Sequence, residues 1–289
     1  MKVRNVLSLF DGISCGRVAL ERVKIEYENY YASEIDKYAI QIAQSNFPNT
    51  IQLGDVKNWK GWDLSQIDLL MGGSPCQGFS ITGKQLNFDD PRSKLFFEFV
   101  DILNYYKPKY FLLENVRMKQ EYQDIISDYL GVQPIKINSA LVSAQNRNRL
   151  YWTNIPNISQ PLDKDIILKD VLEDDESIEN FINYFDIMKS VDSKSNRIGI
   201  IGKGGQGDRI YTINKKSVTV MAESGGNGAN TGLYLTNKKT VRKLMPTECE
   251  RLQNLPDNYT EGVSNNQRYK MLGNGWTVDV ITHILSNIK

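Results

Sequence analysis

Short aliphatic and β-branched runs alternate with helical patterns through the first half of this chain, and this alternation most limits the folds open to it. Strands that alternate with helices form a mostly parallel sheet with helices on both faces. Strands are predicted at residues 3–9, 30–33, 67–71, 110–113, 135–138 and 150–153, and helices at 16–22, 37–46, 94–105 and 121–129. The predicted fold class is therefore α/β, with a doubly wound, mostly parallel sheet.

Polar or glycine-containing segments follow four of these strands, at residues 10–12, 34–36, 72–76 and 114–115. In an open α/β sheet, the loops at the carboxyl ends of the strands line the ligand crevice. These four loops are therefore where functional residues are expected.

The composition changes after Pro161. An acidic stretch at 163–186 gives way to a segment rich in Gly, Ser, Asn and Lys, and residues 189–243 hold eleven Lys or Arg against three acidic residues. Helical periodicity returns near Pro246, and 277–288 is predicted as a closing helix. We therefore expect a catalytic and cofactor-binding domain at 1–160, a smaller basic region at 161–243, and a segment at 244–289 that completes the first domain.

Residue counts exclude several kinds of chemistry. The single histidine, His283, leaves one candidate for any Ser-His-Asp or Cys-His arrangement, and no His or Cys cluster predicts a metal site. Three widely spaced cysteines predict no disulfide framework. No run approaches the ~18 apolar residues of a membrane span, and no signal-peptide core precedes the first strand. A cytoplasmic protein without a membrane partner is expected.

The glycine-containing loop at 10–16, Glu34 and Asp55 together fit a nucleoside. The strand at 3–9 runs through Phe10 to Gly16 into a helix. Glu34 stands roughly 20 residues later, where an acid can bind ribose hydroxyls. Asp55 follows a third strand. Taken singly, the glycine loop is an ordinary turn, and each acid is more often a solvated loop charge. The set lacks a phosphate clamp, which favours S-adenosylmethionine over ATP or NAD.

Three further residue types are predicted to meet at the same crevice. Cys76 follows Pro75 at the end of a strand, although a lone cysteine is usually a small buried hydrophobe. Glu114 ends another strand, where a carboxylate is commonly a helix cap. Alternation before the strand at 150–153 puts Arg147 and Arg149 on one face, although surface charge is the usual explanation of such a pair. Together they suggest covalent attack on a polar, planar substrate.

These blocks, in this order, resemble the DNA (cytosine-5) methyltransferase family. The resemblance runs from Ser8 to about Ile284, apart from the insert, and is especially close to the catalytic domain of the animal de novo enzymes. It implies a Rossmann-like methyltransferase fold and a compact bacterial or phage-borne enzyme. The blocks are Phe10–Gly16, Pro75-Cys76-Gln77, Glu114-Asn115-Val116, Gln145–Arg149, Arg251-Leu252-Gln253 with Pro256-Asp257, and Gly273-Asn274.

The resemblance implies roles for individual residues. Cys76 would attack carbon 6 of cytosine, Glu114 would bind the ring nitrogen and amino group, Arg149 would hold the base carbonyl, and Arg147 would support it or reach a phosphate. Ile35 stands where many relatives place an aromatic ring against adenine. The S-adenosylmethionine contacts implied are Phe10, Asp11, Gly12, Gly16, Glu34, Ile35, Asp55, Val56, Leu95 and Asn274.

The resemblance also implies a DNA partner. The base must be flipped out of the duplex, and residues 78–93 resemble a loop that closes over DNA, with Gly78 and Ser80 as contacts. The basic insert resembles a target-recognition region, in which Lys215 and Lys216 are expected to contact phosphates. A monomer that acts on double-stranded DNA is expected, with a cognate restriction endonuclease as a further partner.

Two other interpretations remain open. A transfer-RNA cytosine-5 methyltransferase would share Cys76 and Glu114, but that branch carries a Cys-Phe-Thr motif, and this chain has no cysteine between Cys76 and Cys249. A catalytically dead DNA-binding paralogue would not need the complete set of Cys76, Glu114, Arg147 and Arg149.

Overall fold

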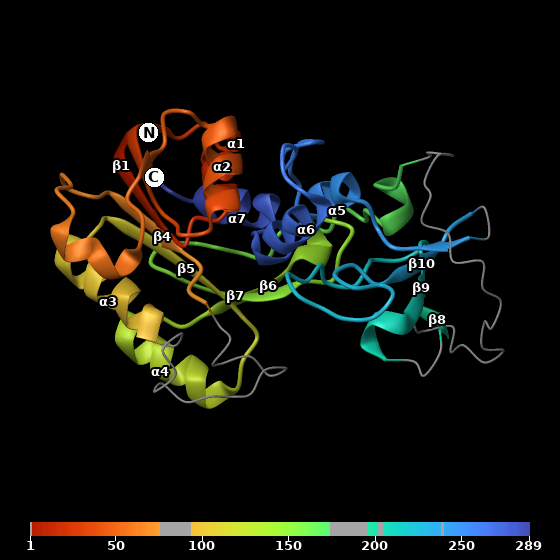
Figure 1. Ribbon diagram of the computed structural model, residues 1–289. Helices are drawn as coiled ribbons and strands as arrows, with labels where there is room; N and C mark the ends of the chain where they lie inside the picture. The colour runs from red at the N-terminus through yellow and green to blue at the C-terminus, as the bar shows by residue number, and fades with distance from the viewer. Residues whose placement is uncertain (1, 76–93, 174–195, 202–204, 238–239) are drawn as a thin grey trace. The chain divides into compact units, whose positions relative to one another are not determined.

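The computed structural model describes residues 2–75, 94–173, 196–201, 205–237 and 240–289. The chain divides into two compact units, which are described separately (Figure 1). The first unit comprises residues 1–138, 148–160 and 280–289, and the second comprises 139–147 and 161–279.

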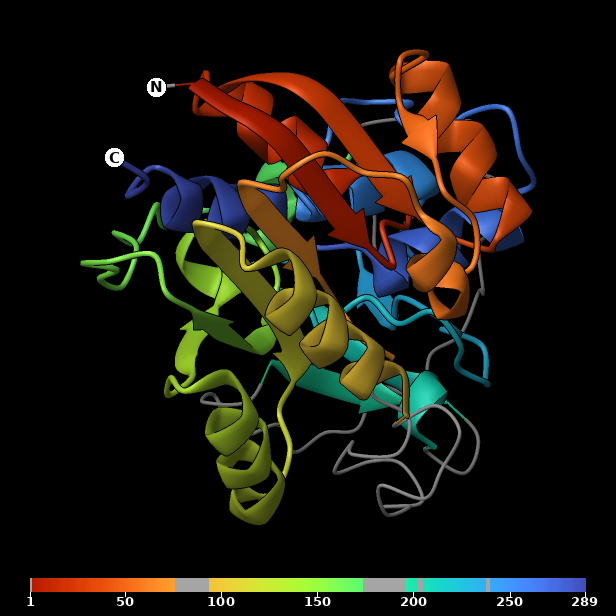
Figure 2. The same ribbon diagram turned by 90° about the vertical axis from the view of Figure 1, so that its left-hand side faces the viewer.

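A seven-stranded sheet forms the centre of the first unit, in the order β3-β2-β1-β4-β5-β7-β6. All neighbouring strands pair in parallel except β7, which runs antiparallel to both β5 and β6. Figure 2 shows the red and orange strands of the N-terminal part running in one direction. The strands are β1 (Lys2–Leu9), β2 (Glu26–Ser33), β3 (Ile51–Gln52), β4 (Leu69–Gly72), β5 (Tyr110–Val116), β6 (Ile135–Asn138) and β7 (Asn148–Thr153).

The strand order reverses at β1, which pairs with β2 on one side and β4 on the other. Right-handed crossovers that leave in opposite directions place their helices on opposite faces of the sheet. Accordingly, α1 and α2 lie on one side, and α3 and α4 on the other (Figure 1). The helices are α1 (Cys15–Arg22), α2 (Lys37–Asn46), α3 (Lys94–Tyr106) and α4 (Gln120–Leu130), with a 3₁₀ turn, η1 (Val56–Gly61), after β3.

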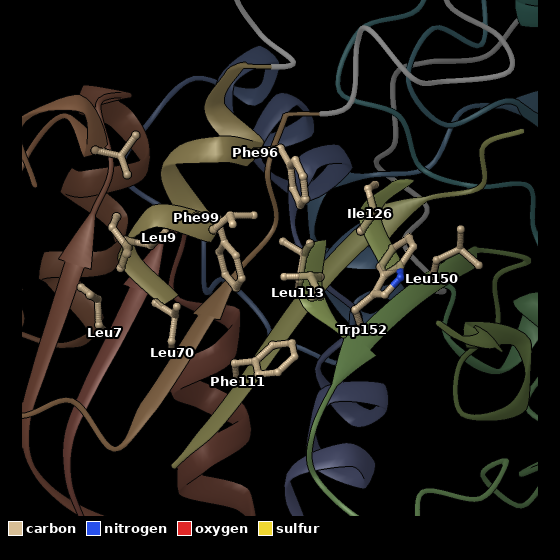
Figure 3. Close-up of a cluster of buried hydrophobic side chains, with 14 of the residues drawn as sticks. Leu7, Leu9, Leu70, Phe96, Phe99, Phe111, Leu113, Ile126, Leu150 and Trp152 are labelled. Carbon is tan, nitrogen blue, oxygen red and sulfur yellow. The ribbon is translucent and has the colours of Figure 1, made fainter. Parts of the chain in front are cut away.

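The main core lies between the sheet and the α3–α4 side (Figure 3). The register aligns Leu7, Leu70 and Phe111 across three strands, and it pairs Leu113 with Trp152. Because side chains alternate between faces, residues 112, 114, 149 and 151 point to the other side. The face that carries Glu114 and Arg149 is therefore the one away from this core.

The predicted elements agree closely with these bounds. The largest difference is β2, which begins at Glu26 and not at Tyr30, because its first residues alternate between exposed and half-buried and so carry no apolar run. The α/β, doubly wound, mostly parallel fold is confirmed. No helix within the described residues is long and apolar enough to cross a membrane.

The second unit contains a small four-stranded sheet in the order β11-β10-β9-β8, with Ile201, Ile210, Leu233 and Val241 as its core. Its other elements are mainly α5 (Pro246–Leu252) and α6 (Asn265–Asn274). The strands are β8 (Arg197–Ile200), β9 (Arg209–Thr212), β10 (Leu233–Leu235) and β11 (Val241–Arg242), joined by 3₁₀ turns η2 (Ser139–Leu141), η3 (Leu168–Asp170) and η4 (Gln206–Asp208).

The division into units differs from the one expected, in which 244–289 returned to the first domain. Only 280–289, which hold most of α7 (Val278–Leu285), belong to the first unit, while α5 and α6 belong to the second. Periodicity identifies these helices but carries no information about what they pack against.

Buried ion pairs join the elements of the second unit. The Arg242 guanidinium binds both carboxylate oxygens of Glu248, at 2.7 and 2.6 Å, and both side chains are almost fully buried. Glu250, also buried, accepts from Arg268 at 2.8 Å and from the backbone N–H groups of Asn258 and Thr260. A buried charge is tolerated only with such partners.

Removing one partner of the buried pair should therefore be costly. We expect Glu248→Ala to lower the free energy of unfolding by about 3–5 kcal/mol, because the Arg242 guanidinium would be left buried and unpaired. Asp257→Ala breaks the far more exposed pair with Arg251 and should cost about 1 kcal/mol or less. Urea unfolding compares the two, and equal losses would contradict the assignment of the Arg242–Glu248 pair to the interior.

Candidate active site

The loop after β1 holds an unusual backbone. Phe10, Gly12 and Ser14 all have positive φ values, at 56°, 58° and 60°. Two of these are not glycine, and such residues persist in this region only where the surroundings impose it, most often at functional sites. The turn is fixed by hydrogen bonds from the N–H of Asp11 to the carbonyl of Ser33 and from the N–H of Ser14 to that of Asp11.

Asp11 is held by hydroxyl groups on both sides. Its Oδ1 accepts from the Tyr30 hydroxyl at 2.7 Å, and its Oδ2 accepts from the Ser14 hydroxyl. Burial raises the pKa of this carboxyl, and the nearby Glu34 carboxylate raises it further, while the hydroxyls oppose the shift. Tyr30, on an inward position of β2, was not among the predicted site residues, and only its position in a strand beside the loop could have indicated it.

The Glu34 carboxylate links the loops after β1 and β2 by hydrogen bonds. Its Oε2 accepts from the N–H of Gly12 at 2.8 Å, and its Oε1 accepts from the N–H groups of Ile35 and Asp36 at 2.8 and 2.9 Å. The carboxylate is therefore oriented by the backbone. Oε2, which accepts a single bond from the backbone, still has a lone pair for a further donor, such as a hydroxyl.

Ile35, next to Glu34, exposes 73% of its surface, more than an aliphatic side chain of this size usually does. Its backbone is anchored, so its side chain presents a fixed apolar surface beside a fixed carboxylate. The combination suits a flat ring whose attached sugar carries hydroxyl groups.

The remaining predicted cofactor residues of the first unit have mainly structural contacts. Asp55 caps η1 by accepting from the N–H of Lys57, Val56 is buried in the core, and Leu95 packs against that core. Gly16 is buried within α1. Asn274 is exposed at the end of α6, in the second unit.

Glu114 and Arg149 form an ion pair, with 2.8 Å between the Arg149 Nε and the Glu114 Oε1. The register explains the contact. Arg149 pairs with Val116, two residues beyond Glu114 on β5, so the two side chains are diagonal neighbours on one face. Both are largely buried. Glu114 lies at the carboxyl end of a central strand, as the sequence predicted, and the Arg149 guanidinium orients its carboxylate.

Asn115, beside Glu114, reaches the segment after β4. Its Nδ2 donates to the carbonyl and hydroxyl oxygens of Ser74, at 3.4 and 3.3 Å. Ser74 stands two residues before Cys76 in the sequence. Cys76 itself, like the predicted DNA contacts Gly78 and Ser80, lies outside the described residues.

Arg147 does not share a strand with Arg149, so the prediction that alternation puts both on one face is wrong. The strand begins at Asn148, so strand alternation does not extend to Arg147. The Arg147 guanidinium donates instead to three backbone carbonyls of the second unit, those of Val220, Gly273 and Gly275. It is therefore left out of the catalytic set proposed below.

The expectation for Lys216 also needs correction. Its ammonium donates to the backbone carbonyls of Ala140 and Ser143 and lies 3.7 Å from Asp163, so it ties segments of the second unit together. Lys215 is half-buried. No cluster of metal-ligating side chains occurs among the described residues.

A model of the C-5 cytosine-specific DNA methylases matches residues 4–289. The chain belongs to this family. Its catalysis is therefore methylation of cytosine in DNA at carbon 5, and Glu114 and Arg149 lie in two of the blocks that carried the resemblance.

Two named relatives align with nearly the whole of this chain. The Type II methyltransferase M.HhaI of Haemophilus parahaemolyticus is 34% identical over 308 aligned residues, covering 98% of this chain and 93% of the relative. The Type II methyltransferase M.NlaX of Neisseria lactamica is 29% identical, covering 98% and 96%. The resemblance drawn from the sequence is confirmed.

Solved structures share the fold of this methylase. The Entamoeba histolytica methyltransferase EhMeth has a TM-score of 0.76 at 20% identity, covering 99% of this chain and 98% of that one. The S. pombe Dnmt2 methyltransferase has a TM-score of 0.73 at 18% identity, covering 98% and 97%.

The environment of Asp11 predicts that its ionised carboxylate lowers the stability of this methylase. A carboxyl whose pKa is raised by folding contributes stability below its unfolded pKa, and this contribution is lost as the pH rises through the folded pKa. Asp11→Asn removes the penalty. We expect the variant to have a larger free energy of unfolding than the parent at pH 7, with the difference shrinking towards pH 4.

Urea unfolding at several pH values tests this expectation. Asp257→Asn is the control of opposite sign, because the Arg251 guanidinium lowers the pKa of Asp257, whose contribution is therefore present at pH 7 and lost on acidification. An Asp11→Asn variant less stable than the parent at neutral pH would show that the hydroxyl contacts outweigh the burial of the charge.

Proposed function

We propose that this methylase transfers a methyl group from S-adenosylmethionine to carbon 5 of cytosine within a specific sequence of duplex DNA, through a covalent adduct with Cys76. The observation that carries the proposal is the Glu114–Arg149 pair at the carboxyl end of β5. It offers a carboxyl group and a guanidinium on one face, which is what the ring nitrogen, amino group and carbonyl of cytosine require.

In this mechanism Glu114 binds ring nitrogen 3 and the amino group of the base. As the Cys76 thiolate adds to carbon 6, electron density moves onto the ring, and a proton supplied to nitrogen 3 by Glu114 neutralises it. Arg149 holds the carbonyl oxygen and keeps the Glu114 carboxyl in place. The ring is thereby converted to an enamine that is nucleophilic at carbon 5.

The covalent cycle closes without any oxidant or metal. Carbon 5 takes the methyl group, and the donor keeps the electron pair of the broken bond as a neutral thioether. Carbon 5 then loses its proton to a base, the electron pair of that C–H bond re-forms the ring double bond and expels the Cys76 thiolate, and nitrogen 3 returns its proton to Glu114. A cytosine inside a duplex cannot be reached on both faces, so the base must be flipped out before attack.

The residues around the β1 and β2 loops fit S-adenosylmethionine. When bound, this cofactor supplies an electrophilic methyl sulfonium. Glu34 would bind its ribose hydroxyls and Ile35 would cover its adenine, while the left-handed loop at 10–14 would face its amino-acid group. The exposed, backbone-anchored Ile35 is the observation that supports this fit.

Target recognition is proposed for the second unit. Its exposed glycine-rich segment around 223–227 and the exposed Arg197 support a surface for DNA, and a basic surface makes affinity depend on salt. The relatives named above are Type II methyltransferases. This supports action beside a cognate restriction endonuclease, whose cleavage the methyl group would block.

The chemistry predicts a trapped intermediate. Fluorine at carbon 5 cannot leave as a cation, so duplex DNA with 5-fluorocytosine at the target should stall the enzyme as an adduct that survives denaturation on a gel. Cys76→Ala should abolish both adduct and turnover. Transfer RNA in place of duplex DNA should give no adduct, and a signal from transfer RNA alone would favour the RNA-directed alternative.

Variants at the other positions sharpen that experiment. Cys15→Ala should leave the adduct intact, and Glu114→Gln should slow its formation by about 10²-fold or more while DNA binding persists, because the proton donor acts mainly in the transition state. An adduct that survives Cys76→Ala and maps to Cys15 or Cys249 would overturn the mechanism. A parent enzyme that binds DNA without turnover would indicate a catalytically dead paralogue.

Ile35 tests the cofactor site. Ile35→Ala should weaken S-adenosylmethionine binding by about 1–2 kcal/mol, from the apolar area no longer covered, whereas Ile35→Tyr should keep or improve affinity. Stability should not change, because the side chain is exposed. Calorimetry measures the affinity, with Leu162→Ala as the control, since Leu162 is 89% exposed and lies in the other unit. Parental affinity in Ile35→Ala would remove Ile35 from the site.

A further inference from the structure

Tyr30, on β2, is a buried hydroxyl donor that the mechanism does not use. It exposes 1% of its surface, and its hydroxyl donates to the Asp11 Oδ1 at 2.7 Å. Tyr31, the next residue, packs against the core on the α3–α4 side, so strand alternation turns Tyr30 to the side where α1 lies (Figure 1). Tyr30 and Asp11 both belong to the first unit.

The Tyr30 ring is held from the side of α1. The Arg17 guanidinium lies 5.0 Å from the ring centroid, within the range of a cation–π contact, and Arg17 exposes only 3% of its surface. Arg17 donates in turn to the Tyr27 hydroxyl at 2.8 Å. It also donates to the side-chain oxygens of Asn49 and Thr50. The Tyr30 hydroxyl therefore has a fixed position beside the loop that follows β1.

Asp11 is a carboxylate without a cation. Hydroxyl groups bind both of its oxygens, that of Tyr30 on Oδ1 and that of Ser14 on Oδ2. Among the described residues no Lys or Arg side chain pairs with it, while the Glu34 carboxylate adds further negative charge nearby. A carboxylate in such surroundings is costly unless a positive charge compensates it. A cationic group on a ligand would supply that charge.

We propose that Tyr30 is a positioning residue for the methyl donor, holding the Asp11 carboxylate for the ammonium of the donor's amino-acid group. The inference rests on the proposed function, in which the loop at 10–14 faces that group. Without the hydroxyl, the carboxylate would have to be ordered by the ligand itself, and this ordering would reduce the affinity. The adenosine part of the donor, assigned to Glu34 and Ile35, does not involve Tyr30.

Two ligands that differ only in the amino-acid group separate this role from a structural one. S-adenosylhomocysteine carries the group, while methylthioadenosine has the same nucleoside and a neutral thioether without it. Calorimetry with the full-length protein measures both affinities in the absence of DNA. We expect Tyr30→Phe to weaken the binding of S-adenosylhomocysteine about tenfold and to leave that of methylthioadenosine unchanged.

Tyr30→Phe removes one atom and keeps the packed ring, so the variant should fold as the parent does. Tyr27→Phe is the matched control. Tyr27 lies on the same strand and also contacts Arg17, but its hydroxyl is bonded to Arg17 and not to Asp11. This variant should bind both ligands with the parental affinity.

A double-mutant cycle tests the route through Asp11. Asp11→Asn removes the charge and should also weaken S-adenosylhomocysteine selectively. The double variant with Tyr30→Phe should bind no more weakly than Asp11→Asn, because the hydroxyl acts through the carboxylate. Additive losses would overturn the inference, since Tyr30 would then act independently of Asp11.

The two ligands also keep this inference apart from the proposed cofactor site. Parental affinity of Tyr30→Phe for S-adenosylhomocysteine, or an equal loss for both ligands, would overturn the positioning role. A parent that binds the two ligands equally well would show that the amino-acid group is not recognised, while leaving the nucleoside contacts standing. A parent that binds neither ligand would contradict the proposed cofactor site itself.

Discussion

The parallel pairing of β1 with both β2 and β4 is the constraint on which the first unit depends. The sheet is therefore built outward on both sides of β1. The carboxyl ends of β1, β2, β4 and β5 meet at one edge of it. The described residues proposed to act within this unit, from Asp11 to Glu114, lie at that edge. The antiparallel β7 adds Arg149 to the same face, because its register with β5 makes it a diagonal neighbour of Glu114.

Hydrogen bonds between side chains and backbone hold the functional loops in place. Glu34 binds three backbone N–H groups, Asn115 binds Ser74, and Arg147 binds three carbonyls. Each such bond satisfies a backbone or side-chain group that would otherwise be costly to bury. The loops are irregular in backbone and still defined in position, which suits a reaction that needs its groups placed before the substrate arrives.

The sequence was informative where periodicity and position suffice. Strand ends located Asp11, Glu34 and Glu114, and the family resemblance placed Arg149 at the same base as Glu114, although it did not predict their ion pair. Prediction from the sequence failed where the position of a side chain depends on a contact with a distant segment. Strand alternation was extended one residue too far to Arg147, and the charge count treated Lys216 as free although carbonyls of Ala140 and Ser143 bind it. Tyr30 looked like an ordinary strand residue, since only the folded chain brings its hydroxyl to Asp11.

The environments of the two described cysteines bear on how this protein can be labelled. Cys15 and Cys249 are both buried, and burial raises the pKa of the Cys249 thiol, with the adjoining Glu248 and Glu250 carboxylates raising it further. Alkylating reagents act on accessible thiolates, which neither residue offers while the chain is folded. Mild treatment with a maleimide or iodoacetamide probe should therefore leave both unmodified. A fluorophore or crosslinker that does attach to the native protein reports on position 76, without any engineered removal of other thiols.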